Sequence, residues 1–212
     1  MHKAVLFDMD GVIVDTEPLH KKAYYMMFNH YNIAVSDTLF QSFTGQSTIN
    51  VCKQVCSVFN LEHPAEVLVS KKREYFKALF FNDPDLKLID GVLDLIKNYY
   101  NNGLTLVLAS SASMTTIDNV FTRFDLDQYF KAKISGADLK ASKPHPEIFE
   151  KAAELSGFKK QECMVIEDST NGIKAAKAAG IYCIGFDSFH SKNQDYSLAD
   201  KVITNFLSIH IN

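Results

Sequence analysis

The chain has 212 residues, of which 47% are apolar and 22% charged, and its formal net charge is −3. This length exceeds the roughly 100–150 residues of a typical domain, so we expect one core domain with a sizeable insertion. The composition is that of a globular protein, no apolar run approaches the roughly 20 residues that cross a bilayer, and the balanced charge gives no overall attraction to nucleic acid.

The first predicted element is a short apolar run over residues 4–7, typical of a strand buried on both faces. The stretch that follows, residues 16–83, has apolar side chains at helical spacing and no convincing buried strand. We interpret it as a helical cap domain inserted after the first strand. The remaining residues, 1–15 and 84–212, would then form the core.

Beyond the insertion, strands and helices alternate. Three further apolar runs predict buried strands, over residues 104–109, 163–166 and 181–185. The helical patterns between them stop at a glycine, a common helix end: Gly103, Gly157 and Gly180. This alternation predicts β-α-β units and therefore an α/β fold with a parallel sheet.

Polar side chains gather where the predicted strands end. Ligands of open parallel sheets bind at the carboxyl ends of the strands. Residues with acid, hydroxyl or amine side chains follow the strands or lie in the loops after them: Asp8, Asp10, Ser110, Ser111, Lys143, Glu167 and Asp168. The amine is that of Lys143, which Pro144 keeps in an extended segment. Gathered carboxylates repel one another unless a cation neutralises them, and hard oxygen ligands favour Mg²⁺. We therefore expect a site for a phosphate ester and magnesium.

The residue types predict distinct roles at this site. Asp8 is the expected nucleophile, since aspartate can form an aspartyl phosphate. Asp10 has the spacing to act as general acid towards the leaving group and then as general base towards water. Ser110 and Lys143 would hold the phosphoryl oxygens and offset their charge in the transition state. Together these residues favour phosphoryl transfer.

The same residues carry a family resemblance. Residues 8–17, Asp-Met-Asp-Gly-Val-Ile-Val-Asp-Thr-Glu, resemble the first motif of the haloacid dehalogenase-like hydrolase superfamily. Ser110, Lys143 and the pair Glu167-Asp168 follow in the order of its second, third and fourth motifs. Residues 165–176 are similar to the branch that contains β-phosphoglucomutase and sugar-phosphate phosphatases. The resemblance covers nearly the whole chain.

This resemblance implies a Rossmann-like core, a mobile helical cap, magnesium and transfer through an aspartyl phosphate. It implies that Asp8 and Asp168 supply carboxylates to the metal and Asp10 its backbone carbonyl. Glu167 would stand beside them, either as a further metal ligand or as a residue that supports the ligands.

Three residues are candidates for substrate binding. Thr16 and His20 match positions near the cap hinge and the substrate in the mutase-like branch, and Ser111 lies next to the second motif. Each also has a plainer interpretation. His20 could be a polar surface residue of a cap helix, and Ser110 or Ser111 could cap the helix that follows.

The sequence departs from the β-phosphoglucomutase pattern in the substrate loop of the cap. That pattern has a Lys just before a Gly and an Arg a few residues after it, whereas residues 43–48 here read Phe-Thr-Gly-Gln-Ser-Thr. A mutase needs cationic contacts to the second phosphate of a sugar bisphosphate, and Thr44 and Thr48 cannot supply them. Lys53 or the run Lys71-Lys72-Arg73, otherwise expected on an exposed helix face, could substitute.

We therefore predict a magnesium-dependent phosphatase that acts on a small phosphorylated metabolite, with sugar phosphates as the expected class and a β-phosphoglucomutase-type mutase as the alternative. A true dehalogenase is disfavoured by Asp10, a receiver module by the cap, and an inactive binding protein by the complete set of motif acids. We expect a monomer with no nucleic-acid or membrane partner. The first residues lack a secretory cleavage site, so a cytoplasmic location is the default.

Overall fold

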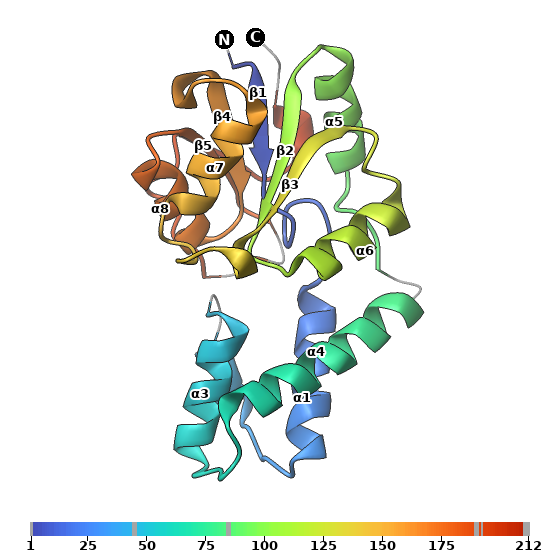
Figure 1. Cartoon of the computed structure of the whole chain (residues 1–212), viewed down its shortest axis with the longest axis vertical. Helices are drawn as coiled ribbons and strands as arrows, with labels where there is room; N and C mark the ends of the chain where they lie inside the picture. The colour runs from blue at the N-terminus through green and yellow to red at the C-terminus, as the bar shows by residue number, and fades with distance from the viewer. Residues whose placement is uncertain (1, 44–45, 84–85, 189–190, 192, 210–212) are drawn as a thin grey trace. The chain divides into compact units, whose positions relative to one another are not determined.

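The computed structural model describes residues 2–43, 46–83, 86–188, 191 and 193–209. The chain forms two compact units, which we call the sheet unit and the helical unit. The sheet unit comprises Met1–Asp15 and Lys87–Asn212, and the helical unit comprises Thr16–Leu86. Figure 1 traces both along the chain.

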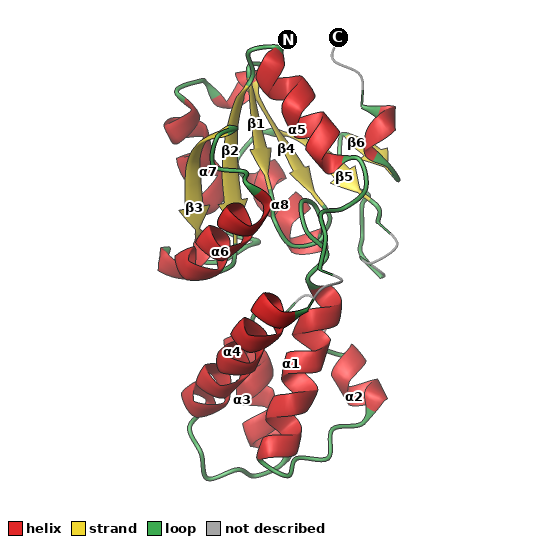
Figure 2. Ribbon diagram, turned by 90° about the vertical axis from the view of Figure 1, so that its right-hand side faces the viewer, coloured by secondary structure: helices red, strands yellow, loops and turns green. Residues whose placement is uncertain are grey.

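The sheet unit contains a six-stranded parallel sheet in the order β3-β2-β1-β4-β5-β6 (Figure 2). Its strands are β1 Ala4–Phe7, β2 Thr105–Ser110, β3 Phe130–Ser135, β4 Cys163–Glu167, β5 Tyr182–Phe186 and β6 Lys201–Ile203. The α/β fold class predicted from the alternation of strands and helices is confirmed. The four predicted strands are β1, β2, β4 and β5, and all four are largely buried.

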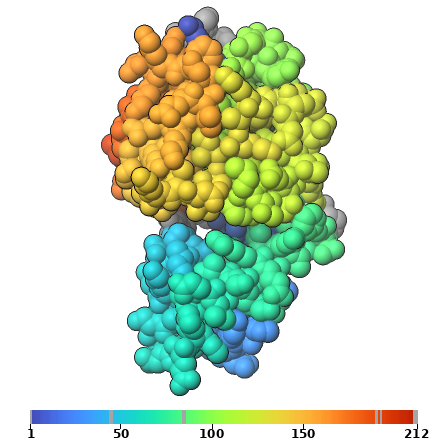
Figure 3. Space-filling model, in the orientation of Figure 1, coloured from blue at the N-terminus to red at the C-terminus, as the bar shows by residue number. Residues whose placement is uncertain are grey.

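Helices cover both faces of the sheet. They are α5 Val92–Asn101, α6 Met114–Phe124, α7 Glu147–Ser156 and α8 Thr170–Ala178, with short 3₁₀ turns at Gly136–Asp138, Lys160–Glu162 and Phe206–Ser208. Apolar residues of α7 and α8 pack with alternate residues of β1, β2 and β4, such as Leu6 and Val107. In Figure 3 the orange atoms of α7 lie on the side of the sheet unit that faces the viewer. On the other face, Phe7 packs against Tyr99 of α5, and Phe130 packs against Phe121 of α6.

The helical unit consists of α1 Glu17–His30, α2 Asp37–Gln41, α3 Thr48–Val58 and α4 Ala65–Asn82, and its described residues form no strand. Aromatic and aliphatic side chains from these helices form its own core, among them Tyr24, Phe28, Val55 and Leu68. Ser36 and Ser47 begin α2 and α3 by accepting hydrogen bonds from backbone N–H groups three residues on. None of the described helices in either unit is long and apolar enough to cross a membrane.

Candidate active site

The order of the sheet sets the place of the site. The strands are parallel, but their chain order reverses between β1 and β4: β2 and β3 follow on one side of this pair and β5 and β6 on the other. A reversal of this kind marks the switch point where open α/β sheets bind ligands. Phe7 of β1 pairs with Ile166 of β4 on one side and with Leu108 of β2 on the other. The next residues, Asp8, Glu167 and Ala109, therefore emerge side by side at the carboxyl ends of three strands.

Lys143 joins these three strand ends. Its ammonium nitrogen donates to Asp8 Oδ1 over 2.6 Å, to Glu167 Oε1 over 2.9 Å and to the carbonyl oxygen of Ala109 over 3.1 Å. The side chain comes from the loop before α7, and only 6% of it is exposed. Its ammonium nitrogen also lies 4.9 Å from the ring centroid of Phe149. Lys143, the residue of the third motif, thus contacts the acids of the first and fourth motifs and the residue just before Ser110 of the second.

Asp168 completes a cluster of three carboxylates. Asp8, Glu167 and Asp168 each offer an oxygen atom within 4.8 Å of the others. Two glycines leave room for these carboxylates, because a side chain at Gly11 would overlap Asp168 Oδ2 and one at Gly172 would overlap the carboxylate of Glu167. The structure therefore brings together the predicted acids of the first and fourth motifs.

Burial and the mutual repulsion of the carboxylates shift the pKa values of the aspartates in this cluster. Burial raises the pKa of Asp8 to about 7, Lys143 opposes that rise, and the charges of Glu167 and Asp10 add to it. Burial, together with Glu167 and Asp8, also raises the pKa of Asp168 well above its usual range. Burial by itself would lower the pKa of Lys143, but the facing Asp8 and Glu167 carboxylates raise it instead. Burial is thus the main cause of the raised pKa values of the two aspartates, and the neighbouring carboxylates add to it.

A divalent cation fits this donor set. The buried carboxylates of Asp8 and Glu167 and the half-buried one of Asp168 lie near one ammonium group, and carboxylate oxygens are the ligands that Mg²⁺ prefers. Both oxygens of Glu167 already accept hydrogen bonds, Oε1 from Lys143 and Oε2 from the backbone N–H and hydroxyl of Ser169. Asp8 and Asp168 are consequently the acids best placed to hold a cation, with Glu167 orienting the lysine.

The remaining predicted residues of the sheet unit lie around this cluster. Asp10 follows β1 at a turn in which Gly11 takes a φ of 83°, and its charge acts on Asp8. Ser110 is fully buried at the end of β2, where its hydroxyl accepts a hydrogen bond from the backbone N–H of Ala112. Ser111 is exposed in the next turn.

Neither Ser110 nor Ser111 caps helix α6, so that interpretation is wrong. The cap is Ser113, whose hydroxyl accepts from the backbone N–H of Thr116. Ser111 does not cap the helix and is exposed in the turn between β2 and α6.

The other two candidates belong to the helical unit. Thr16 is fully buried just before α1, where its carbonyl oxygen accepts from the backbone N–H of His20. The ring of His20 stacks on Phe76 with the centroids 4.3 Å apart. His20 also lines a pocket of about 180 Å³ with Glu17, Lys21, Tyr24, Phe40, Phe43, Gln46, Thr48, Val51 and Lys72.

Lys72 is a residue that sequence reasoning placed wrongly. It was expected on an exposed face of α4, but it is only 3% exposed. Its ammonium nitrogen lies 2.6 Å from Nδ1 of His20 and about 5 Å from the ring centroids of Tyr24 and Phe76. The available signal was its spacing from Leu68 and Phe76, which puts Lys72 on the buried stripe of α4.

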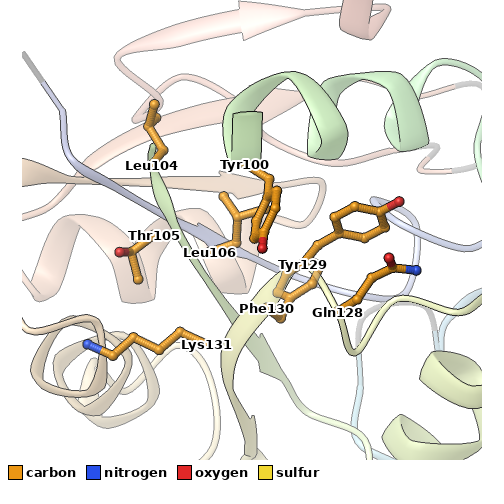
Figure 4. Close-up of a pocket in the computed structure, with 8 residues that line it drawn as sticks. All are labelled: Tyr100, Leu104, Thr105, Leu106, Gln128, Tyr129, Phe130 and Lys131. Atoms are coloured by element: carbon orange, nitrogen blue, oxygen red, sulfur yellow. The ribbon is translucent and has the colours of Figure 1, made fainter. Parts of the chain in front are cut away.

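A second pocket, of about 240 Å³, lies at the opposite end of the sheet. Its lining includes Thr105 and Phe130, the first residues of β2 and β3, together with Tyr100 from the end of α5 and the neighbouring Tyr129 (Figure 4). The site residues lie at the last residues of their strands or just after them, so this pocket is separate from the site.

The fold and the site define an α/β protein whose acids and lysine meet at the switch point of a parallel sheet. The family model of the haloacid dehalogenase-like hydrolases matches residues 5–186. The chain belongs to this family, which confirms the resemblance seen in the motifs.

Named relatives extend over most of the chain. A phosphorylated carbohydrates phosphatase from Thermotoga maritima is 29% identical over 93% of this chain and 90% of its own length. A fructose-1-phosphate phosphatase from Escherichia coli is 25% identical over 85% of this chain and 94% of its own. Among solved structures, a β-phosphoglucomutase from Clostridium difficile superposes with a TM-score of 0.78 at 25% identity, covering 96% of this chain and 91% of that one.

Proposed function

We propose that this phosphoric monoester hydrolase releases phosphate from small phosphorylated carbohydrates, with Mg²⁺ as its cofactor and Asp8 as its nucleophile. The observation that carries the proposal is the contact of Lys143 with Asp8 and Glu167 inside the cluster that these two carboxylates form with Asp168. The two phosphatase relatives support the substrate class.

In the first step, an oxygen of the Asp8 carboxylate attacks the phosphorus atom and the bond to the sugar oxygen breaks. Asp10 gives its proton to the departing oxygen, which leaves as an alcohol. In the second step, Asp10 takes a proton from water, whose oxygen attacks the aspartyl phosphate. Inorganic phosphate leaves and the Asp8 carboxylate is restored, so each group returns to its starting state.

Lys143 and Ser110 stabilise the transferring group in this scheme. The ammonium of Lys143 is fixed by Glu167 and Ala109, so it adds positive charge without having to reorganise. Ser110 is fixed at the end of β2 by its bond from Ala112. Mg²⁺, held by Asp8, Asp168 and the Asp10 carbonyl, would offset the charge of the phosphoryl oxygens.

The helical unit is proposed to act as the cap that selects the organic part of the substrate. His20 and Lys72 offer polar groups in a pocket whose other walls include the rings of Tyr24 and Phe40. Such a mixture of rings and few polar groups suits a sugar, whose ring faces are apolar and whose hydroxyls need partners. Thr16, at the start of this unit, is proposed to lie at the hinge.

A mutase is the weaker candidate. The β-phosphoglucomutase relative shares the architecture, but the described residues of the substrate loop, Phe43 and Gln46 to Thr48, carry no charge. Thr44 and Gly45 lie outside the described residues. Lys72 gives the pocket a buried cation, but Lys21 is the only other lysine or arginine among the described residues that line it. This favours substrates with a single phosphate group.

The test is a screen of purified protein with Mg²⁺ against sugar phosphates, nucleotides, pyrophosphate and both β-phosphoglucose isomers. We expect phosphate release to be fastest with sugar monophosphates and to be lost with excess EDTA. Interconversion of the two glucose phosphates faster than phosphate release would instead establish the mutase. Fastest hydrolysis of nucleotides or pyrophosphate would refute the proposed substrate class.

A further inference from the structure

The connection between β5 and β6 lies against the turn that carries Asp168. The hydroxyl of Ser191 donates to Asp168 Oδ2. The phenol of Tyr196 donates to the backbone carbonyl of Asp168 over 3.0 Å and contacts the carbonyl of Ser191 at 3.4 Å. Both the side chain and the backbone of Asp168 are therefore bonded to residues more than twenty positions later in the chain.

The same connection also holds the residue that begins α8. Gln194 Oε1 accepts from the backbone N–H of Thr170 over 2.8 Å, and the N–H of Asp195 donates to the Thr170 hydroxyl over 2.7 Å. Four side-chain or backbone bonds thus fix the turn from Asp168 to Thr170. None of these bonding partners belongs to the four motifs.

Two glycines allow Tyr196 and Asp168 to pack closely in this arrangement. A side chain at Gly185, in β5, would come within 2.9 Å of the Tyr196 ring, so glycine lets that ring lie against the strand. Gly11 leaves space for Oδ2 of Asp168, the same oxygen that Ser191 contacts. Ser191 is itself 9% exposed and is oriented by Ser188, whose hydroxyl oxygen lies 2.8 Å from the Ser191 hydroxyl and accepts from its N–H.

We propose that Ser191, supported by Tyr196, is a positioning residue that fixes the Asp168 carboxylate for a divalent cation. The hydroxyl occupies Oδ2 and so directs the remaining oxygen towards the acidic cluster. Partners of this kind orient metal-binding carboxylates, and their loss commonly weakens metal affinity by about 10- to 100-fold. The inference rests on the metal site of the proposed function and adds a residue outside its motifs.

The test measures Mg²⁺ binding to the metal-free full chain by calorimetry, at fixed pH and ionic strength. We expect Ser191→Ala to raise the Mg²⁺ dissociation constant by about tenfold. Ser191→Thr, which keeps a hydroxyl, should recover most of the affinity. Ser197→Ala is the matched control, since Ser197 is an exposed serine of the same connection that contacts Asp195, and it should bind Mg²⁺ like the wild type.

Kinetics separates positioning from a general structural defect. In Ser191→Ala the Mg²⁺ concentration for half-maximal activity should rise by the same factor as the dissociation constant, while kcat at saturating Mg²⁺ falls less. Tyr196→Phe, which removes one neutral hydrogen bond to Asp168, should weaken Mg²⁺ binding by about threefold. This second variant keeps the proposal testable if Ser191→Ala does not fold.

The outcomes distinguish this inference from the proposed function. Equal or tighter Mg²⁺ binding in Ser191→Ala and Tyr196→Phe overturns the inference alone, because it means that the hydroxyl competes with the cation or is irrelevant to it. A wild type that binds no Mg²⁺ overturns the metal site and the inference together. Weakened binding in both variants supports the inference even if the substrate screen disfavours sugar phosphates.

Discussion

The two units each bury a lysine, and the surroundings of the two lysines differ. In the sheet unit, Lys143 contacts the carboxylates of Asp8 and Glu167 and the carbonyl of Ala109. In the helical unit, Lys72 lies beside an imidazole and over the rings of Tyr24 and Phe76. One cation is embedded among negative charges, and the other among polarisable rings.

The two environments suggest that the sheet unit serves the chemical step and the helical unit serves substrate binding. An ammonium held by carboxylates is fixed in place and suits a reaction in which negative charge develops at one point. An ammonium among aromatic rings keeps more of its positive field for an incoming anion or hydroxyl. We therefore expect substitutions in the sheet unit to act mainly on kcat and substitutions in the helical unit mainly on KM.

The largest effect should follow Asp8→Asn. An amide cannot form an acyl phosphate, so phosphate release from a sugar monophosphate should fall by at least about a thousandfold. Asp90→Asn provides a control, because the Asp90 side chain is 95% exposed and should leave the rate unchanged. Appreciable turnover by Asp8→Asn would remove Asp8 from the chemistry.

Lys143→Met tests the lysine of the sheet unit. Loss of its charge should reduce kcat by roughly 10²- to 10³-fold. It should also destabilise the metal-free chain by on the order of 3 kcal/mol, since it leaves buried carboxylates without their partner. Lys140→Met, in the same loop but exposed, should change neither the kcat nor the denaturation midpoint. A defect confined to KM would contradict the role given to Lys143.

Lys72→Met tests the lysine of the helical unit. We expect KM for the preferred sugar phosphate to rise by about tenfold, with a smaller change in kcat, because a charge-assisted contact to substrate is lost. Lys71→Met is a matched control, since the adjacent Lys71 pairs with Glu74 on the surface of the same helix. Equal kinetics in the two variants would assign Lys72 to packing alone.

The acidic cluster should also make stability depend on pH. The pKa of Asp8 is raised to about 7 by burial, from an ordinary value of 3.8, so between these values the folded chain holds a proton that the unfolded chain releases. The metal-free protein should therefore lose stability as the pH rises from about 4 to about 7, and Asp8→Asn should flatten this decline.

Thermal melts with and without Mg²⁺ measure this dependence. Mg²⁺ should raise Tm by more at about pH 8 than at about pH 5, because the cation competes with protons for the carboxylates. The same Mg²⁺ shift at both pH values would contradict a metal site that includes Asp8.

Much of the sheet unit was predictable because its central strands are continuous apolar runs. Residues 4–7 and 163–166 are buried on both faces, and the acids directly after them had to meet at one edge. The strands β3 and β6 escaped prediction because they lie at the edges of the sheet. Both include exposed charged residues, Lys131 and Lys201, which break the apolar run.

The sequence was less informative where a side chain depends on distant partners. Lys72 is buried because rings of α1 and α4 surround it, and the lysine run by itself indicates only a charged helix face. Ser191 contacts Asp168 across a separation of 23 residues, and its surroundings in the sequence resemble any polar loop. Motifs predicted the acids and the lysine, whereas packing decides which further residues support them.

Chemical trapping of the intermediate tests the central claim most directly. The wild-type enzyme is quenched during turnover of its preferred sugar phosphate with Mg²⁺, treated with borohydride to reduce any acyl phosphate, and analysed by peptide mass spectrometry. Our account predicts that residue 8, and no other carboxylate, is converted to homoserine, and that Asp8→Asn shows no conversion. Trapping at a different residue, or none at Asp8 during rapid turnover, would contradict it.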